Sequence, residues 1–273
     1  MHFYKGKYST KILNKDTHVI GLKFKQFVVF TTLCFLFSCK QETGTLSKID
    51  GKQVSIDASL EEVDSIAHFV EPYRNRINQV LDSTLAYAPK PFLLDDGEHN
   101  TSMGNLMADI VLSEAAPIFK SRTGNDLDFV VLNYGGVRSI ISSGNVTARN
   151  AYEVMPFENY ITVVEMSGSA VRELIAFLMG SDRVHPIAGM QIVLDKNGSL
   201  ESVDIQGEPF DENRNYFVGT SDYLVQGGPS IGFFKDTVST THIDYLIRNA
   251  IIDYFKKTDT LKASVDDRFI QIN

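Results

Sequence analysis

Cysteine is almost missing from this sequence of 273 residues, and its two cysteines, Cys34 and Cys39, both lie near the amino terminus. A domain built from the rest of the chain therefore has no disulfide, no cysteine-ligated zinc and no thiol nucleophile. Tryptophan is absent altogether, and no low-complexity tract or internal repeat is visible. The length and the 43% apolar content suit one large globular domain, alone or with an amino-terminal appendage.

Basic charge is also scarce. The chain has 26 lysines and arginines against 34 acidic residues, a formal net charge of −8. Residues 1–38 contain six lysines and one acidic residue, so removing them takes away +5 and leaves −13. A surface this acidic argues against binding a nucleic acid polymer, which needs basic patches. Any phosphate recognition must then depend on individual arginines.

Histidine is sparse, and its positions do not form the motifs of a metal site. Beyond residue 38 the histidines are far apart in the sequence, at His68, His99, His185 and His242. A two-metal phosphoesterase needs a cluster of histidine, aspartate and asparagine ligands around its metals, and no Walker loop occurs either. We predict that this chain holds no metal or cofactor and, alone, does not hydrolyse phosphate esters.

The amino terminus has the pattern of an export signal. Its lysines precede an apolar run at residues 27–37, which is too short to span a membrane but has the length of a signal-peptide core. The run ends in Leu36-Phe37-Ser38-Cys39, which resembles a bacterial lipobox, a motif whose cysteine is lipidated. We predict a signal peptide at 1–38, a lipid on Cys39 and a polar tether at 39–58. An uncleaved hydrophobic anchor is the alternative, and both place the domain outside the cytoplasm.

Residues 59–273 have the pattern of one domain in which helices and strands alternate, with hairpins between them. A capping-box pattern at Ser59–Glu62 predicts a helix over 59–81 with one apolar face. Further helices are expected at 106–123, 148–153, 170–179 and 243–254. Strands are expected at 84–88, 127–133, 160–166, 187–195, 200–205, 216–221 and 268–272. The order predicts an α/β (α+β) domain of mixed sheets with flanking helices.

The central feature is the run Leu127–Asn133, which leads directly into Tyr134-Gly135-Gly136-Val137-Arg138. Its apolar residues are nearly continuous, which predicts a strand buried on both faces. Adjacent glycines let a backbone approach a ligand closely, and ligands bind at the carboxyl ends of strands in open α/β sheets. Arg138 follows at that end and suits a planar or anionic partner. A plain turn with a solvated arginine remains the alternative.

Four segments together resemble the carboxyl-terminal domain of the bacterial 5′-nucleotidase and UDP-sugar hydrolase family. In chain order they are SMGNLMAD at 102–109, NYGGVR at 133–138, PFEN at 156–159 and TSDYLVQGG at 220–228. In that family this domain binds the nucleoside part of the substrate. A separate amino-terminal calcineurin-like domain holds two metals and cleaves the phosphate ester. Beyond residue 38 its metal motifs, Asp-x-His, Gly-Asn-His-Asp/Glu and His-x-His, do not occur here.

The resemblance implies a role for individual residues. Arg138 matches an arginine that contacts substrate, and Phe157 and Tyr223 match two aromatics that clamp the base. Asn159 matches a nearby polar contact. The predicted substrate-binding residues are Asn105, Gly135, Gly136, Arg138, Phe157, Asn159, Tyr223, Gly227 and Gly228. Two positions depart from the family: Asn105 stands where an arginine is frequent, and Pro229 stands where an acidic residue is usual.

Structural roles are the alternative for several of these residues. Phe157 has the character of a core residue, and Tyr223 of a residue that closes a strand end. Asp109 and Asn133 are expected to be structural, as a helix-face partner and a turn former.

The resemblance predicts the nucleotide-recognition half of a split 5′-nucleotidase. A separate calcineurin-like metallophosphoesterase chain would supply the divalent metals. A stand-alone surface lipoprotein that binds nucleosides without catalysis is the alternative, and a relative with an inactive pocket is a third, because fold does not fix function.

Overall fold

The computed structural model describes residues 23–33, 46, 48–57, 59–228, 234 and 237–272. The chain divides into two compact units, Met1–Glu61 and Glu62–Asn273. In the first unit residues 23–33 are helical and largely exposed. None of the helices in the described ranges combines the length and apolarity that crossing a membrane requires. Cys39, the predicted lipid site, lies outside the described residues, as does Pro229.

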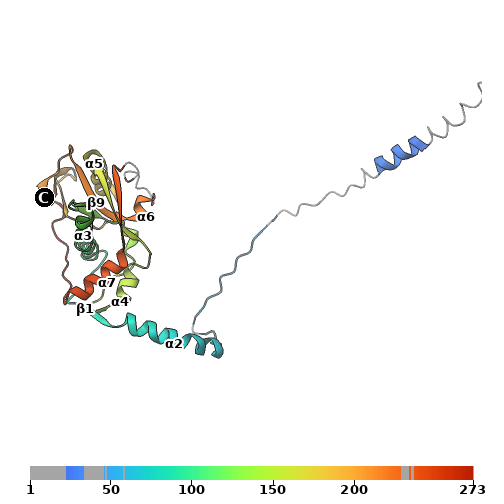
Figure 1. Ribbon diagram of the computed structural model, residues 1–273, viewed down its shortest axis with the longest axis horizontal. Coiled ribbons are helices and arrows are strands. Elements are labelled where there is room, and N and C mark those ends of the chain that lie inside the picture. Colours follow the sequence, from blue (N-terminus) through green and yellow to red (C-terminus); the bar gives the residue numbers. More distant parts are fainter. Residues whose placement is uncertain are drawn as a thin grey trace, which may run out of the picture. The chain divides into compact units, whose positions relative to one another are not determined.

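The second unit is built on a five-stranded sheet (Figure 1). Its order is β10 (Ser239–Leu246), β4 (Tyr160–Ser167), β9 (Asn215–Ser221), β2 (Phe129–Val131) and β5 (Ile187–Ala188). β9 and β2 run parallel, and the other neighbours are antiparallel. The sheet is therefore mixed, as the sequence predicted.

Both faces of this sheet are covered. Successive residues of β2 alternate between two hydrophobic cores: Val130 belongs to one, and Phe129 and Val131 to the other. The first core contains α3 (Ser102–Thr123) and α7 (Ile247–Lys257), and the second contains α5 (Gly168–Gly180). Because a strand points its side chains to opposite faces in turn, only an apolar run fits between two cores. The prediction of a strand buried on both faces is confirmed.

Two smaller sheets complete the unit. One has four strands in the order β11 (Phe269–Gln271), β6 (Met190–Leu194), β7 (Leu200–Ile205) and β8 (Glu208–Pro209), and it packs into the second core. The other pairs β1 (Thr84–Ala88) with β3 (Gly144–Thr147), beside α4 (Ala148–Val154). The predicted α/β class with mixed sheets and flanking helices is confirmed. Because Glu62–Asn273 holds both cores, a fragment beginning in the tether is expected to fold alone.

α2 (Asp64–Leu81) differs from the prediction in two ways. It begins at Asp64, five residues after Ser59, and its cap residue Val63 makes no side-chain hydrogen bond to it. The capping-box prediction is therefore wrong: Ser59 bonds to Asp57 instead, through its backbone N–H and its hydroxyl. None of its residues is buried, so the predicted apolar face exists but packs on no core.

The predicted helix at 243–254 begins four residues later, with α7 at Ile247. Residues 239–246 form β10 instead, and Thr240, Thr241 and His242 lie opposite Val164, Val163 and Thr162 of β4. Threonine and isoleucine favour a pleated surface. Pairing along an existing strand therefore outweighs the helical spacing of the apolar residues here.

Candidate functional site

Four loops that are distant in the sequence meet at the same edge of the five-stranded sheet, namely the edge formed by the ends of its strands. The parallel neighbours β2 and β9 end at this edge, and they lead to Asn133 and Tyr223. β4 runs antiparallel to β9, with Ile161 opposite Ser221, so the residues before β4 also reach the edge. The same holds for the residues before β5, which is antiparallel to β2. The sheet topology therefore brings these loops together.

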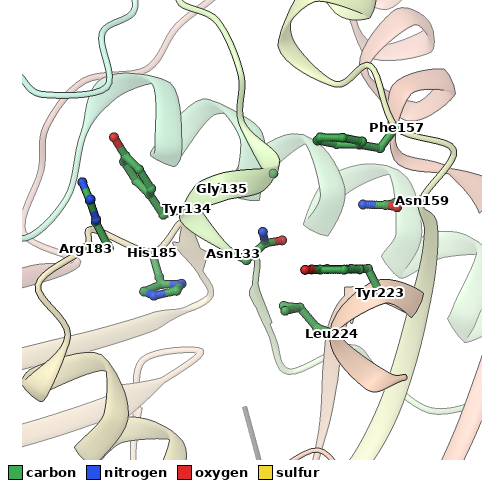
Figure 2. Close-up of a pocket in the computed structure, with 10 residues that line it drawn as sticks. Asn133, Tyr134, Gly135, Phe157, Asn159, Arg183, His185, Tyr223 and Leu224 are labelled. Carbon is green, nitrogen blue, oxygen red and sulfur yellow. The ribbon is translucent and has the colours of Figure 1, made fainter. Parts of the chain in front are cut away.

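A cavity of about 360 Å³ opens between the loops (Figure 2). This volume falls within the range of small-molecule sites. The cavity is lined by Asn133, Tyr134, Gly135, Gly136, Phe157, Asn159, Arg183, His185, Tyr223 and Leu224. Five of these were predicted from the sequence as binding residues: Gly135, Gly136, Phe157, Asn159 and Tyr223.

The rings of Phe157 and Tyr223 face each other across one end of the cavity, and Asn159 lies at the gap between them (Figure 2). Each aromatic residue is 42% exposed, and neither belongs to a hydrophobic core. The alternative in which Phe157 fills the core is therefore wrong. Two facing rings with an open gap are an arrangement into which a flat apolar group can insert from solvent.

Arg248 of α7 holds the loop that carries Phe157. Its guanidinium donates hydrogen bonds to the carbonyls of Met155 (3.4 Å) and Phe157 (3.2 Å) and pairs with Glu158. It also lies over the ring of Tyr152, 4.4 Å from the centroid. Arg248 is buried, so these contacts fix the loop from the inside of the molecule.

Tyr223 is held by the short helix α6 (Asp222–Val225). The hydroxyl of Ser221 accepts a hydrogen bond from the backbone N–H of Leu224 (3.3 Å) and caps the helix. The N–H of Gly228 donates to the carbonyl of Tyr223 (3.0 Å), which folds the loop back onto the ring. Gly227 has φ +97°, a conformation that favours glycine. The two predicted glycines therefore shape the loop around Tyr223 and do not line the cavity.

Replacing Gly228 by alanine is expected to move the Tyr223 ring. A Cβ at this position would lie 2.8 Å from the ring and 3.0 Å from the carbonyl of the same residue. We expect Gly228→Ala to weaken ligand binding at the cavity by about tenfold, because the displaced Tyr223 ring would lose part of its stacking energy with the ligand. Calorimetric titration measures the loss. Gly198→Ala, at a turn with positive φ and open space around it, controls for a general effect on folding. Unchanged affinity for Gly228→Ala would contradict this.

Arg138 lies beside the cavity and does not line it. Its side chain is exposed and donates one long hydrogen bond (3.5 Å) to the carbonyl of Gly135. The neighbouring glycines line the cavity, and a Cβ on Gly136 would lie 3.0 Å from the amide oxygen of Asn133. The Gly-Gly pair thus lets Asn133 face the cavity, and Arg138 is available at its rim.

Asn105 lies apart from the cavity, and its role differs from the predicted one. The residue is buried near the start of α3, and its amide donates to the side chain of Asn100 (2.6 Å) and the carbonyl of Ser264 (2.9 Å). On the same helix Asp109 pairs with Arg268 (2.8 and 3.1 Å), which confirms the structural interpretation of Asp109. Asn105 ties α3 to the carboxyl-terminal segment, and we do not propose it as a substrate contact.

The far end of the cavity is formed by residues that the sequence did not indicate. The guanidinium of Arg183 lies over the ring of Tyr134, 5.3 Å from its centroid, and His185 packs nearby (Figure 2). Arg183 and His185 precede β5, a strand whose position the sequence did predict. They could have been found only with knowledge that β5 pairs antiparallel with β2, which brings its preceding loop to the ligand edge.

His185 is expected to make stability depend on pH. Burial lowers its pKa, and a contact between Nδ1 and the Leu132 carbonyl (3.3 Å) opposes that change only in part. The unfolded chain therefore binds a proton at higher pH than the folded one does. The free energy of unfolding should fall as pH drops below about 6.5 and level off below the folded-state pKa.

Urea denaturation of wild type and His185→Gln at pH 8 and pH 5 measures this effect. The variant should lose part of the wild-type dependence, whereas His68→Gln on the exposed helix α2 should retain it. Equal dependence in wild type and His185→Gln would contradict the prediction.

Within the described ranges, no group of three or more histidine, cysteine, aspartate or glutamate side chains could hold a metal. The residues that line the cavity include no carboxylate. They offer instead three aromatic rings, an imidazole, two amides and a guanidinium. This set can stack on a flat ring, hydrogen-bond to its edge and tolerate a negatively charged substituent.

Comparison with known proteins relates the chain to one family. The sequence profile described as "5′-nucleotidase, C-terminal domain" matches residues 86–236, more than half of the chain. The NAD 5′-nucleotidase of Haemophilus influenzae is 34% identical over 209 residues, which cover 69% of this chain and 34% of that protein. The cell wall protein Lmo0130 of Listeria monocytogenes is 28% identical over 235 residues, 74% of this chain and 29% of that protein.

A solved structure has the same fold. The 5′-nucleotidase precursor of Thermus thermophilus superimposes with a TM-score of 0.62 at 20% identity, covering 77% of this chain and 43% of that one. The chain therefore spans well under half the length of these relatives, and the larger part of each lies outside the match.

Proposed function

This chain belongs to the family of the 5′-nucleotidase C-terminal domain, and from that premise we propose that it is the nucleoside-recognition half of a split 5′-nucleotidase. The phosphoesterase half, with its divalent metals, would be a separate calcineurin-like chain. In this arrangement the described cavity binds the nucleoside, and hydrolysis of the phosphate ester takes place on the partner.

The observation that carries the proposal is the facing pair of Phe157 and Tyr223. These residues lie 66 positions apart in the chain, yet their rings face each other across one cavity with Asn159 at the gap. A base that stacks on an aromatic ring gains about 1–3 kcal/mol whatever its identity. A double platform would therefore bind several nucleotides and orient each in the same way.

Other residues of the cavity suit the rest of a nucleotide. The amides of Asn133 and Asn159 can donate to and accept from base edges or ribose hydroxyls. Arg183 lines the cavity and Arg138 lies at its rim, where either can attract the phosphate. The absence of a carboxylate among the lining residues avoids repulsion of that phosphate. In this arrangement the chain's own residues bind and orient, and they leave the ester bond accessible to a partner.

An extracytoplasmic location fits the same proposal. The amino terminus has the pattern of an export signal with a lipobox, and the Listeria relative is named a cell wall protein. We propose that Cys39 carries a lipid that anchors the chain to a bacterial membrane. Mass spectrometry of the mature protein would show a lipidated Cys39 as the first residue; an unmodified peptide spanning residues 30–45 would contradict the anchor.

Calorimetry of the fragment 40–273 with AMP, UMP and adenosine tests the binding half of the proposal. We expect all three to bind, because stacking tolerates different bases. The absence of binding heat for all of them would exclude a nucleoside pocket.

A second assay tests the split enzyme. A secreted calcineurin-like phosphoesterase without a carboxyl domain, encoded next to this chain, is expected to hydrolyse AMP faster in its presence. This chain alone, with Mn²⁺ or Zn²⁺, should show no turnover; activity that EDTA removes would contradict the assignment of the metals to a partner. Binding of AMP without any effect on the phosphoesterase would favour the stand-alone nucleoside-binding lipoprotein.

A further inference from the structure

Helix α2 carries an apolar surface that nothing in the described part of the chain covers. Its members recur every three or four residues and so share one side of the helix. We call this surface the apolar stripe of α2; it consists of Val63, Ile66, Phe69, Tyr73, Ile77 and Val80. Each of the six is between 53% and 69% exposed. At 1.5 Å per residue the stripe is about 25 Å long.

Such a surface is unusual on a domain that acts alone. Monomeric proteins rarely expose large contiguous apolar patches, and those that do commonly use them to bind a partner. α2 also contacts the rest of the domain at one end. Arg149 of α4 donates to Asp82 (2.6 Å) and Asn78 (2.9 Å). These contacts join the carboxyl end of α2 to α4, and the two helices lie next to each other in Figure 1. The stripe is therefore presented on an anchored helix.

The place of α2 in the chain indicates which partner covers it. The helix ends at Leu81, directly before the region 86–236 that matches a carboxyl-terminal domain. The relatives hold most of their length outside the match. In a relative whose carboxyl-terminal part matches this chain, the preceding part of the protein would be connected at the position that α2 has here. An apolar surface at that junction is where the other half of a two-part enzyme would pack.

The charge of α2 argues against a lipid surface as the occupant. The segment 61–81 contains four acidic residues and two arginines, so it is acidic overall. Helices that lie on bacterial membranes carry lysine and arginine on the polar face, which attract anionic lipids. An acidic segment lacks that attraction, and a protein groove is the better match for the stripe.

We propose that the apolar stripe of α2 is the docking surface for the phosphoesterase chain of the split enzyme, an inference that rests on the proposed function. The partner chemistry it requires is an apolar groove that receives one face of a helix. Docking there would place the partner on an element that is anchored to α4, outside the loops of the nucleoside cavity.

A triple substitution tests the proposal: Ile66→Ser, Tyr73→Ser and Ile77→Ser, in the fragment 40–273. The matched control places three serines on the opposite face, as His68→Ser, Asn75→Ser and Gln79→Ser. Both variants carry equal numbers of serines, so a loss of helix propensity is matched. AMP titration of both should give the wild-type affinity, because α2 does not line the cavity.

The probe is the adjacent calcineurin-like phosphoesterase, titrated into each variant. We expect the stripe variant to bind at least about 30-fold more weakly than wild type, the effect of losing one interface hot spot. The control should bind as wild type does. Equal binding of wild type and stripe variant would overturn the docking inference and leave the split enzyme standing. If wild type does not bind the phosphoesterase although its AMP affinity is intact, both the docking inference and the split enzyme are overturned. The nucleoside pocket would still stand.

Two further measurements identify other occupants. Sedimentation that shows a wild-type dimer, lost in the stripe variant, would assign the stripe to a second copy. Binding to vesicles of phosphatidylcholine and phosphatidylglycerol, lost in the same variant, would assign it to a membrane. Either result overturns the proposal, and their absence together with stripe-dependent phosphoesterase binding supports it.

Discussion

Replacing both Phe157 and Tyr223 by alanine is expected to abolish nucleoside binding by the fragment 40–273. Each ring supplies about 1–3 kcal/mol of stacking, so the single substitutions should weaken AMP binding by about 10–100-fold. The double substitution should remove both platforms and reduce binding below detection. Calorimetric titration with AMP measures all three variants.

Folding should survive these substitutions. Both side chains lie outside the two hydrophobic cores, so the free energy of unfolding should change by no more than about 1 kcal/mol. Tyr160→Ala is a matched control, since Tyr160 follows Phe157 by three residues, is equally exposed at 42% and does not line the cavity. A double variant that still binds AMP with near wild-type affinity would refute the base clamp.

Substituting Arg248 by methionine is expected to reduce both stability and binding. The change removes the donors to the carbonyls of Met155 and Phe157 and leaves those groups without their partner. A buried polar group without a partner costs about 1–3 kcal/mol, so the free energy of unfolding should fall by about 2–4 kcal/mol. The loop that presents Phe157 loses its internal support, and AMP affinity should fall by about tenfold.

Two variants separate positioning from stability. Arg248→Lys keeps a positive charge near Glu158 but lacks the planar fork that reaches both carbonyls, so it should restore part of the stability and little of the affinity. Arg149→Met removes an exposed ion pair between α4 and α2. It should lower the free energy of unfolding far less than Arg248→Met does, because the pair is exposed to solvent, and it should leave AMP binding unchanged. Wild-type affinity in folded Arg248→Met would show that Arg248 does not position Phe157.

The sequence indicated the core strand and much of the cavity for clear physical reasons. A nearly continuous apolar run at 127–133 fits only a strand with cores on both sides, and β2 has that position. The paired glycines at 135–136 predicted a close approach of the backbone to a ligand, and both glycines line the cavity. Phe157, Asn159 and Tyr223 were found through resemblance to a family, because nothing local distinguishes an aromatic of a cavity from one of a core.

Other features depend on pairings that no local pattern records. β10 forms because β4 offers a strand edge with which it can pair, although the apolar residues of β10 have helical spacing. Arg248 reads as a polar position of an amphipathic helix, and its carbonyl partners lie about 90 residues earlier. Arg183 and His185 reach the cavity only because β5 is antiparallel to β2. For α2 the predicted period of the apolar residues was right, but none of the described residues of the domain buries them.

The separation of the stacking rings from both cores has a consequence for how this domain diversifies. Most residues at the sheet edge can mutate without disturbing the layers of helix and strand that make the protein fold. New ligand preferences can therefore arise through single changes in the loops, while the scaffold stays intact. Relatives with the same architecture need not share a ligand, because the side chains at the positions of Phe157 and Tyr223 can differ while both cores are kept.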